Sequence, residues 1–505
     1  MVRATVVQVA LGVGLSGAAA SWLVQGCTED DVEASVAPAS HTEDSEPATP
    51  YDGTEEEPAS EREARARQER LDRDYPLHGV VTGVQLAVRE AADPESAVLG
   101  WLRIGARIRL KPEPTTTSSC ASGWYRIAPR GWGCAGLGIE VGDEPPDVEV
   151  ATKPPDHDAP LPYAYYFVKE NMVPEYHRLP SRDEQRAAQA YADRYFELHE
   201  DDESRAERFL EGELPGEQAR PAVVRRFLER GFYVAGTGVE ERAFRHFVRT
   251  VRGSYVKKAR TVVHTGSELQ GVELDDERSL PVAFALRAIR PLVRKPAEEE
   301  PDRFVDDEEA EAIERQTVVE GWAERERVGK HIYHRFEVDG EPRYARDWFI
   351  GVADKMDPPF DVREEEPWVH VDLGDQTLVL YRGEEPTYAT LVSTGLEDHE
   401  TPTGVFPVKK KLLSATMSDL GPEAGDDRYR IEDVPWTQYF KGSVALHGTF
   451  WHNRFGLQRS HGCVNLSPRD AHRIFRATWP RVPEGWHGVT TDRTELEASR
   501  VVITE

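Results

Sequence analysis

The chain lacks the excess of basic residues that a nucleic-acid-binding protein needs. It has 62 lysines and arginines against 91 aspartates and glutamates, which gives a formal net charge of -29 at pH 7. Phosphate backbones are bound by basic surfaces, so this balance argues against nucleic acid as a partner. Much of the acid lies in segments that we interpret as linkers, where it favours solubility.

Charge of either sign is missing from most of the N-terminal segment. After Arg3 no charged residue occurs until Glu29, and the stretch between them is apolar with small residues. A basic start followed by an apolar core predicts an export signal over residues 1–27. The run is also long enough to cross a bilayer, so an uncleaved anchor is the alternative.

The end of this segment, "LVQGC", resembles the lipobox of bacterial lipoproteins, in which the cysteine is acylated and becomes the new N-terminus. The resemblance implies that Cys27 carries lipid, although Gln25 stands where a small residue is usual. We therefore expect a periplasmic protein that is anchored to a membrane by lipid, with inner or outer membrane left open.

Cysteine is scarce, with four residues among 505, so each can be considered separately. Cys120 and Cys134 lie in a Gly/Trp-rich stretch, and in an oxidising compartment we expect them to form a disulfide that contributes about 3 kcal/mol. If Cys27 is lipidated and that pair is bonded, Cys463 is left over. An unpaired thiol in an exported protein indicates reactivity.

Lysine and arginine are also absent from residues 28–60, where acids, prolines and serines dominate. Such a composition predicts a disordered acidic tether, which we extend to residues 28–75. Short apolar runs broken by Gly, Pro and Asp then predict a small β barrel at residues 77–142. The order of "AVRE", "AVLGWLRIGARI" and "SGWYRI" resembles bacterial SH3-like domains, which implies a wall-binding role.

The middle of the chain, residues 160–295, predicts an α+β region whose role is open. Ser181 and Glu184 form a capping-box pattern at the start of one helix. Pro221 and Gly231 frame a second. Strands are expected after it. An acidic linker at residues 296–314 and a lead-in at residues 315–367 complete this part.

From residue 368 onward, apolar and polar residues alternate between turns at Gly374-Asp375 and Arg382-Gly383. This pattern predicts antiparallel strands and a mostly-β domain over residues 368–505. The predicted fold class is therefore multidomain: a small barrel, an α+β region and a β-rich C-terminal domain.

Cys463 lies in "RSHGCVNL", close to three histidines at 447, 452 and 461. A thiol attacks carbonyl groups as the thiolate, so a nearby base must take its proton. His461 lies two residues earlier, on the same face if the segment is extended, and His447 ends an apolar strand. Gly462 permits a tight turn in which its N–H and that of Cys463 form an oxyanion hole.

Two other interpretations apply to these residues. A cysteine near a histidine is most often a structural coincidence. Three histidines and a cysteine also resemble a zinc ligand set, but their spacing matches no common structural site. We place His452 in a loop near the cleft, outside the catalytic machinery.

Four motifs together are more specific: "VSTG" at 392–395, "TPTGVFPV" at 401–408, "HGT" at 447–449 and "SHGCVN" at 460–465. Their order and spacing resemble the L,D-transpeptidase catalytic domain of the bacterial cell wall (YkuD type). The resemblance implies that Cys463 is the acylated nucleophile and His447 its base. It implies no metal and no cofactor. Further site residues that it implies are Ser460, His461 and Gly462, which shape the turn and the oxyanion pocket, and the candidate substrate contacts Gly448, Thr449 and Asn465.

In that family the thiolate attacks a tetrapeptide stem of peptidoglycan between diaminopimelate and the terminal D-alanine, and then passes the acyl group to an amine. The resemblance thus implies peptidoglycan stem peptides as partners and 3→3 cross-links as the product. Water as acceptor gives an L,D-carboxypeptidase, and a lipoprotein lysine as acceptor gives wall anchoring. A wall-binding lipoprotein with an inactive catalytic domain is the remaining alternative.

Overall fold

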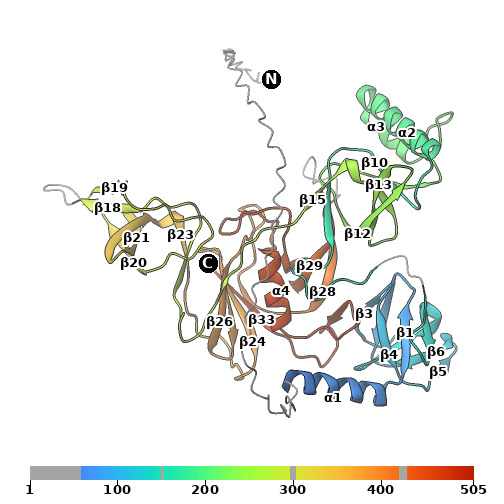
Figure 1. The fold of residues 1–505 in the computed structure, drawn as a ribbon, viewed down its shortest axis with the longest axis horizontal. Coiled ribbons are helices and arrows are strands. Elements are labelled where there is room, and N and C mark those ends of the chain that lie inside the picture. Colours follow the sequence, from blue (N-terminus) through green and yellow to red (C-terminus); the bar gives the residue numbers. More distant parts are fainter. Residues whose placement is uncertain (1–58, 149–152, 296–302, 420–428) are drawn as a thin grey trace, which may run out of the picture. The chain divides into compact units, whose positions relative to one another are not determined.

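A computed structural model describes residues 59–148, 153–295, 303–419 and 429–505 (Figure 1). Nearly all of the described residues belong to one compact unit, Ser60–Glu505. The expected export signal, the lipidation of Cys27 and most of the tether lie outside the described residues. In the ranges that are described, no helix is long and apolar enough to cross a membrane.

The first described element is a helix, α1 (Ala59–Asp74). The prediction of disorder up to residue 75 is therefore wrong for this part. The Ala, Glu and Arg residues of α1 have high helix propensity, and the prediction of disorder considered only their charge. The Asp72 carboxylate at the end of α1 pairs with Arg109 of the barrel at 2.9 Å. Arg109 also donates to the carbonyl oxygen of Tyr75 at 3.0 Å, so two contacts hold this end.

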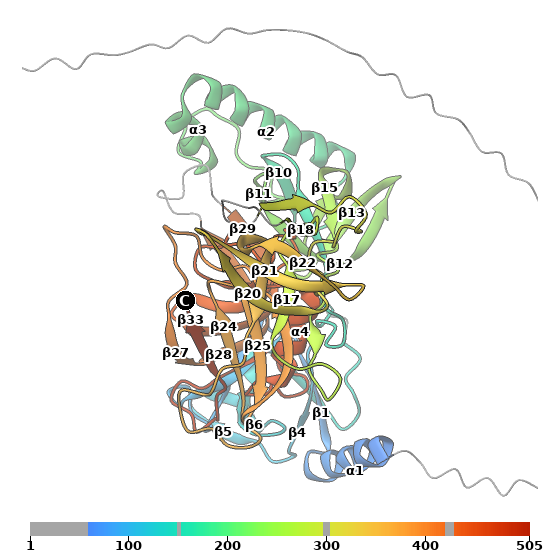
Figure 2. The same cartoon turned by 90° about the vertical axis from the view of Figure 1, so that its left-hand side faces the viewer.

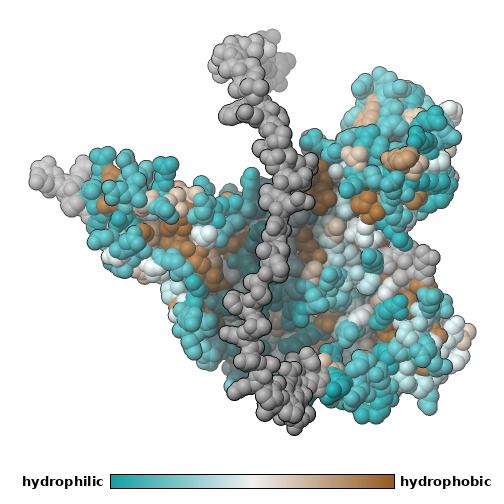
Figure 3. Space-filling view, in the orientation of Figure 1, coloured by the Kyte–Doolittle hydropathy of each residue, from teal (hydrophilic) through white to brown (hydrophobic). Residues whose placement is uncertain are grey.

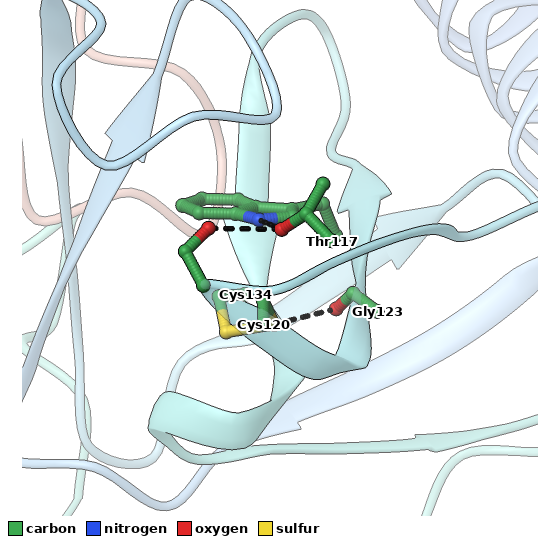
Figure 4. Close-up of a disulfide and its surroundings, with 6 residues drawn as sticks. Thr117, Cys120, Gly123 and Cys134 are labelled. Atoms are coloured by element: carbon green, nitrogen blue, oxygen red, sulfur yellow. Dashed lines mark hydrogen bonds between the residues drawn. A yellow bond between two sulfur atoms is a disulfide. The ribbon is translucent and has the colours of Figure 1, made fainter.

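Eight short strands lie within the bounds expected for the barrel. They are β1 (Leu77–Val81), β2 (Gln85–Arg89), β3 (Val98–Arg103), β4 (Arg107–Leu110), β5 (Thr115–Thr117), β6 (Cys120–Arg126), β7 (Trp132–Cys134) and β8 (Ile139–Gly142). β1 pairs with β4 and β8, and β2 pairs with β3 and β7. The Cys120–Cys134 disulfide joins β6 to β7 beside buried Trp124, with 6.0 Å between the two Cα atoms (Figure 4).

The middle region is a sheet module that carries two helices. Its strands are β9 (Ala164–Val168), β10 (Val173–Tyr176), β11 (Val224–Leu228), β12 (Tyr233–Arg242), β13 (Arg245–Thr250), β14 (Tyr255–Lys257) and β15 (Thr261–His264). Helices α2 (Arg182–Asp201) and α3 (Glu203–Leu210) lie side by side (Figures 1 and 2). On the face drawn in Figure 3 their surface is mostly hydrophilic.

The two helix predictions for this module had different outcomes. α2 begins after Ser181, and the expected capping box with Glu184 is present. The second predicted helix is wrong, because the segment between Pro221 and Gly231 contains strand β11, which pairs antiparallel with β10. A proline that suits a helix start did not decide the structure here, since Val224 and Leu228 are buried in the sheet module.

The expected acidic linker and lead-in are also corrected. β18 (Leu292–Lys295), β19 (Arg303–Asp306), β20 (Trp322–Val328), β21 (His331–Val338) and β22 (Glu341–Arg346) form a five-stranded sheet. β17 (Val282–Ala285) and β23 (Ile350–Ala353), which precede and follow these strands in the chain, pair with each other. Buried aromatic residues such as Phe336 and Tyr344 stabilise these strands, and the acidic composition had concealed them.

The C-terminal domain packs two sheets around one core. The first contains β16 (Val272–Glu273), β24 (Pro367–Asp372), β25 (Thr377–Arg382), β26 (Glu385–Leu391), β27 (Gly404–Pro407) and β33 (Arg500–Thr504). The second part contains β28 (Lys410–Asp419), β29 (Tyr429–Lys441), β30 (Val444–Gly448), β31 (Val464–Leu466) and β32 (Gly488–Thr490). Helix α4 (Pro468–Ala477) follows β31, and the core includes Val371, Leu378, Trp436, Leu446 and Val464.

Both N-terminal modules are joined to this domain by strand pairing and by shared core. β3 of the barrel pairs with β32, and Trp486 packs in the barrel core with its indole N–H donating to the carbonyl oxygen of Ala128 at 3.0 Å. β12 of the middle module pairs with β29 at Tyr233 and Ile431. The N-terminal strand module is thus built onto the C-terminal domain rather than attached by a free linker.

Candidate active site

Two parallel strands bring Cys463 and His447 together. In the β30–β31 pair, Leu446 lies opposite Val464 and His447 lies opposite Asn465. Stepping back one residue places Cys463 opposite Ala445. Because side chains alternate along a strand, Cys463 and His447 then project from the same face, two positions apart. The strand register thus aligns the two residues that the sequence predicted as nucleophile and base.

Cys463 ends a tight turn, residues 459–463, which we call the cysteine loop. Gly462 has φ of 104°, a left-handed conformation that favours glycine. The Ser460 hydroxyl donates to the carbonyl oxygen of Cys463 at 2.5 Å and accepts the Gly462 N–H at 3.2 Å. Ser460 therefore closes the turn, and it already engages one of the two amides expected for the oxyanion hole.

The loop is attached along one side to the "VSTG" segment. Ser393 and Asn465 exchange two backbone hydrogen bonds, at 3.0 and 2.9 Å. The carbonyl oxygen of Thr394 accepts the N–H groups of Arg459 at 2.8 Å and Ser460 at 2.9 Å. The first motif thus forms a backbone support for the cysteine loop.

The "TPTG" segment closes the other side. Thr401 accepts the Gly395 N–H through its hydroxyl at 2.9 Å, and the same hydroxyl donates to the carbonyl oxygen of Gly462 at 2.9 Å. Gly395 has no room for a side chain, since a Cβ there would lie 2.0 Å from the carbonyl oxygen of His399. The motifs recognised in the sequence therefore form one hydrogen-bonded structure around the turn.

His447 is buried, with 2% of its surface exposed. Its Nδ1 lies 3.3 Å from the carbonyl oxygen of Gly448, and we assign the ring proton to this nitrogen because the carbonyl can only accept. Nε2 is then left as the acceptor. Burial lowers the pKa of His447 to about 4, only partly opposed by that carbonyl, so the imidazole is neutral at neutral pH and able to take a proton.

The thiol of Cys463 is partly exposed, and its Sγ lies 3.8 Å from the carbonyl oxygen of Ser443. Burial raises its pKa, partly opposed by a hydrogen bond from the Ala445 backbone. The ground state is therefore a neutral thiol beside a neutral imidazole. Such a pair ionises the thiol during the reaction, by general-base catalysis, instead of storing a thiolate beforehand.

Two tyrosines of β29, Tyr429 and Tyr439, interact electrostatically with Cys463. Burial, and then negative charge at Cys463, raises the pKa of Tyr439 to about 12, and the same causes raise the pKa of Tyr429. Both phenols therefore stay protonated at neutral pH and keep an O–H donor near the thiol. Sequence reasoning missed them, because they lie outside the four motifs and the aromatic residues of β29 carry no distinctive pattern.

His461 does not share a strand face with Cys463, as an extended segment would require. The left-handed backbone at Gly462 interrupts the extension between them. The His461 side chain is exposed, with its ring centroid 4.5 Å from that of His399 and 6.0 Å from that of Tyr429. This leaves His447 as the buried histidine aligned with the thiol by strand register.

His452, which we placed outside the machinery, contacts Asn465. Its Nδ1 accepts the Arg454 N–H at 3.2 Å, so the proton is on Nε2, which lies 3.0 Å from the Asn465 amide. Turning that amide so that Oδ1 accepts this proton also pairs an oxygen that is otherwise buried without a partner. Burial, and then Arg459, lowers the pKa of His452 to about 3, so the ring is neutral.

The three candidate substrate contacts are all buried. Thr449 is 0% and Asn465 4% exposed, and a Cβ on Gly448 would lie 2.9 Å from Pro435. In this structure they pack around His447 and the cysteine loop. Open space is found beside the loop instead, in a pocket of about 620 Å³ whose lining includes Thr394, Gly395, Glu400, Thr401, Lys441 and Gln458.

No group of three or more His, Cys, Asp or Glu side chains within the described ranges is arranged to hold a metal ion. A thiol aligned with a buried neutral histidine is instead the arrangement that thiol-based acyl transfer uses. The site therefore resembles those of enzymes that transfer acyl groups through a thiol, and it lies on a β-rich, multi-sheet domain.

Comparison with known proteins makes this class specific. Residues 366–490 match the family model of the L,D-transpeptidase catalytic domain (YkuD). This part of the chain belongs to that family. The match begins close to the expected residue 368, and strand β33 extends the folded sheet beyond it, to Thr504.

Solved L,D-transpeptidases are similar to part of the chain. A mutant enzyme from Enterococcus faecium is 20% identical over 30% of this chain and 55% of its own, with a TM-score of 0.22. The isolated catalytic domain from the same species is 24% identical over 28% of this chain and 98% of its own, with a TM-score of 0.21. An enzyme from Mycobacterium smegmatis is 15% identical over 43% of this chain and 100% of its own, with a TM-score of 0.23.

The chain spans about half the length of the first of these structures. No curated protein sequence matches it.

Proposed function

We propose that the protein is a peptidoglycan L,D-transpeptidase that uses a Cys463 thioester to form 3→3 cross-links between stem peptides. The observation that carries the proposal is the strand register that puts Cys463 and His447 on one face, inside a domain of the L,D-transpeptidase family. The neutral state of both groups supports a mechanism in which the proton moves during attack.

In the first half-reaction, the proton of the Cys463 thiol passes to Nε2 of His447 while sulfur bonds to the carbonyl carbon of the donor stem. The tetrahedral intermediate carries its charge on oxygen, and in this proposal the Cys463 N–H donates to that oxygen. The carbon–nitrogen bond then breaks, and His447 returns the proton to the departing amine of D-alanine. A thioester remains on Cys463.

In the second half-reaction, an amine of another stem attacks the thioester carbonyl carbon. His447 takes one proton from that amine, the carbon–sulfur bond breaks, and the proton returns to sulfur. The thiol is regenerated and a new amide bond joins the two stems. The Gly448 carbonyl holds the Nδ1 proton through both halves, which keeps Nε2 free for the transfers.

For the cellular setting we propose a periplasmic enzyme, anchored through lipid on Cys27, with an acidic tether that ends at α1. The tether raises the local concentration of the enzyme at its insoluble substrate without adding contacts at the active site. Because the barrel shares its core with the catalytic domain, any wall contact of the SH3-like barrel would fix the orientation of the active site as well.

Purified sacculi test the reaction. They are incubated with the protein or with its Cys463→Ala variant, digested with a muramidase and separated by mass. New 3→3 dimers, formed only with the intact thiol, are expected. Tripeptide stems without dimers would show that water is the acceptor and would refute the cross-linking proposal, and unchanged stems would refute the activity.

A further inference from the structure

The turn between β24 and β25 contains an unusual residue. Gln376 has φ of 55°, a left-handed conformation that glycine, asparagine and aspartate adopt more readily than glutamine. It is also buried, with 4% of its surface exposed. A long polar side chain in a buried, unfavourable backbone position requires compensating contacts.

Those contacts are made to the "VSTG" segment. The side-chain amide nitrogen of Gln376 donates to the Thr394 hydroxyl at 2.6 Å and to the carbonyl oxygen of Leu373 at 2.7 Å. Its amide oxygen accepts the Thr394 N–H at 3.0 Å. Gln376 thus holds Thr394 through both its backbone and its side chain, and Thr394 is fully buried.

Thr394 in turn holds the beginning of the cysteine loop. Its carbonyl oxygen accepts the N–H groups of Arg459 and Ser460. Ser460 then closes the turn on the carbonyl oxygen of Cys463. An unbroken path of hydrogen bonds therefore leads from Gln376 to the backbone of the nucleophile.

The same turn is held from the module that precedes the catalytic domain. Asp375, next to Gln376, accepts hydrogen bonds from Arg325 of β20 and from the N–H of Val352 in β23, the latter at 3.2 Å. Its own N–H donates to Asp372 at 2.8 Å. The module over β17–β23 thus supports the turn that carries Gln376.

We propose that Gln376 is a positioning residue for Cys463: through Thr394 it fixes the stem of the cysteine loop, and with it the alignment of the thiol to His447. It does not touch the reacting atoms. The inference rests on the proposed function, because the reaction that Gln376 supports is the one proposed above. The alignment of the thiol can also be measured independently, through the reactivity of Cys463 towards an alkylating agent. Misplacing a reacting group by about 1 Å costs on the order of 100-fold in rate.

Threonine-to-valine substitutions provide a matched pair. Thr394→Val keeps the shape but removes the hydroxyl that accepts from Gln376. Thr390→Val is the control, because Thr390 is equally buried in the same domain and loses one hydrogen bond, to Asp470 at 2.6 Å. The measurement is the rate constant for acylation of Cys463 at saturating carbapenem, with the concentration for half-saturation determined separately.

We expect Thr394→Val and Gln376→Met each to lower the acylation rate constant by about 10-fold or more, with little change in half-saturation. Thr390→Val should lower the melting temperature about as much as Thr394→Val does, but it should leave the acylation rate constant unchanged. The double variant should lose no more rate than Gln376→Met alone, since Gln376→Met already removes the bond that Thr394→Val breaks. Equal losses in Thr394→Val and Thr390→Val, or multiplicative losses in the double variant, would overturn the proposal.

Alkylation by iodoacetamide separates this proposal from the proposed function, because it requires only the thiol. If the wild-type protein forms no carbapenem adduct, the proposed function fails, and the pH midpoint of Cys463 alkylation becomes the readout. A midpoint shifted in Thr394→Val and Gln376→Met, but not in Thr390→Val, would still support positioning. Identical midpoints in all four proteins would overturn it.

Discussion

Replacing Arg103 with methionine removes the cation that faces Asp433 where the barrel meets the catalytic domain. The two side chains form an ion pair, and Ser414 donates to the same carboxylate oxygen at 2.9 Å. Only 3% of the Asp433 side chain and 16% of the Arg103 side chain are exposed. The methionine variant therefore leaves a buried carboxylate with the Ser414 hydroxyl donor but without its paired cation; the charge of Arg252 still acts on it.

The expected cost follows from that burial. Breaking a buried pair by removing one partner typically costs about 3–5 kcal/mol, because the remaining charge stays desolvated. We expect Arg103→Met to lose this much unfolding free energy at pH 7. Arg103→Met combined with Asp433→Asn should recover most of it, since the amide carries no charge. Arg107→Met, at an exposed arginine of the neighbouring strand, is the control and should change stability little.

The pH dependence gives the prediction a second test. Burial raises the pKa of Asp433, but Arg103, with smaller contributions from Arg252 and Ser414, outweighs burial and holds that pKa below its usual value. A depressed carboxyl pKa contributes stability that is present above the unfolded pKa of about 3.9 and is lost as pH falls through the folded value. Without Arg103 the carboxyl protonates more readily, so the stability gap between wild type and variant should narrow below pH 5.

Urea titrations monitored by tryptophan fluorescence at pH 7 and pH 4 measure this gap. A variant as stable as wild type at pH 7 would refute the reasoning. So would a double variant that recovers nothing, or a gap that widens in acid.

Three further predictions concern the catalytic domain. The acylation rate of Cys463 should be constant from pH 5 to pH 7 and should fall as the pH drops through about 4, because protonated His447 cannot accept the thiol proton. A pH–rate profile whose acidic fall is centred above pH 6 would contradict this. Lys411 is buried and donates to the carbonyl oxygens of Phe475 and Thr478 at the end of α4, and burial holds its pKa well below the usual value. Lys411 therefore binds a proton in the unfolded state but not in the folded state. Between pH 8 and pH 10 the unfolding free energy of the wild type should rise, relative to that of Lys411→Met, by up to about 1.4 kcal/mol per pH unit. Urea midpoints that change equally with pH in the two proteins would contradict this. Gly395→Ala should lower the acylation rate constant by about 10-fold or more, because the added Cβ displaces Thr401 and, with it, the cysteine loop. An unchanged rate constant would show that the loop tolerates this displacement.

The candidate pair could be found in the sequence because both residues lie in short local motifs. Cys463 and His447 lie on one face through the register of two consecutive strand segments, and Gly462, beside Cys463, has the left-handed backbone that favours glycine. The start of α2 was predictable for the same reason, since a capping box is formed by residues three positions apart. Local chemistry of this kind can be read without a fold.

What escaped prediction depends on contacts between distant segments. β11 was mistaken for a helix because its identity comes from pairing with β10, about 50 residues away in the chain. Gln376 reaches Thr394 only because a left-handed turn points it there, and Arg103 meets Asp433 across the junction of two modules. The acidic segments around α1 and β19 were assigned by composition, which does not register the few apolar and paired residues that order them.

The central claim is that Cys463 carries the acyl group of a peptidoglycan stem as a thioester. The most direct measurement is acid quenching of the protein during turnover with a disaccharide tetrapeptide, followed by proteolysis and mass spectrometry. The account predicts a stem lacking its terminal D-alanine attached to the peptide that contains Cys463, much less of it in a His447→Gln variant, and none in Cys463→Ala. An adduct on any other residue, or a folded wild-type protein that releases D-alanine without an adduct at Cys463, would contradict it.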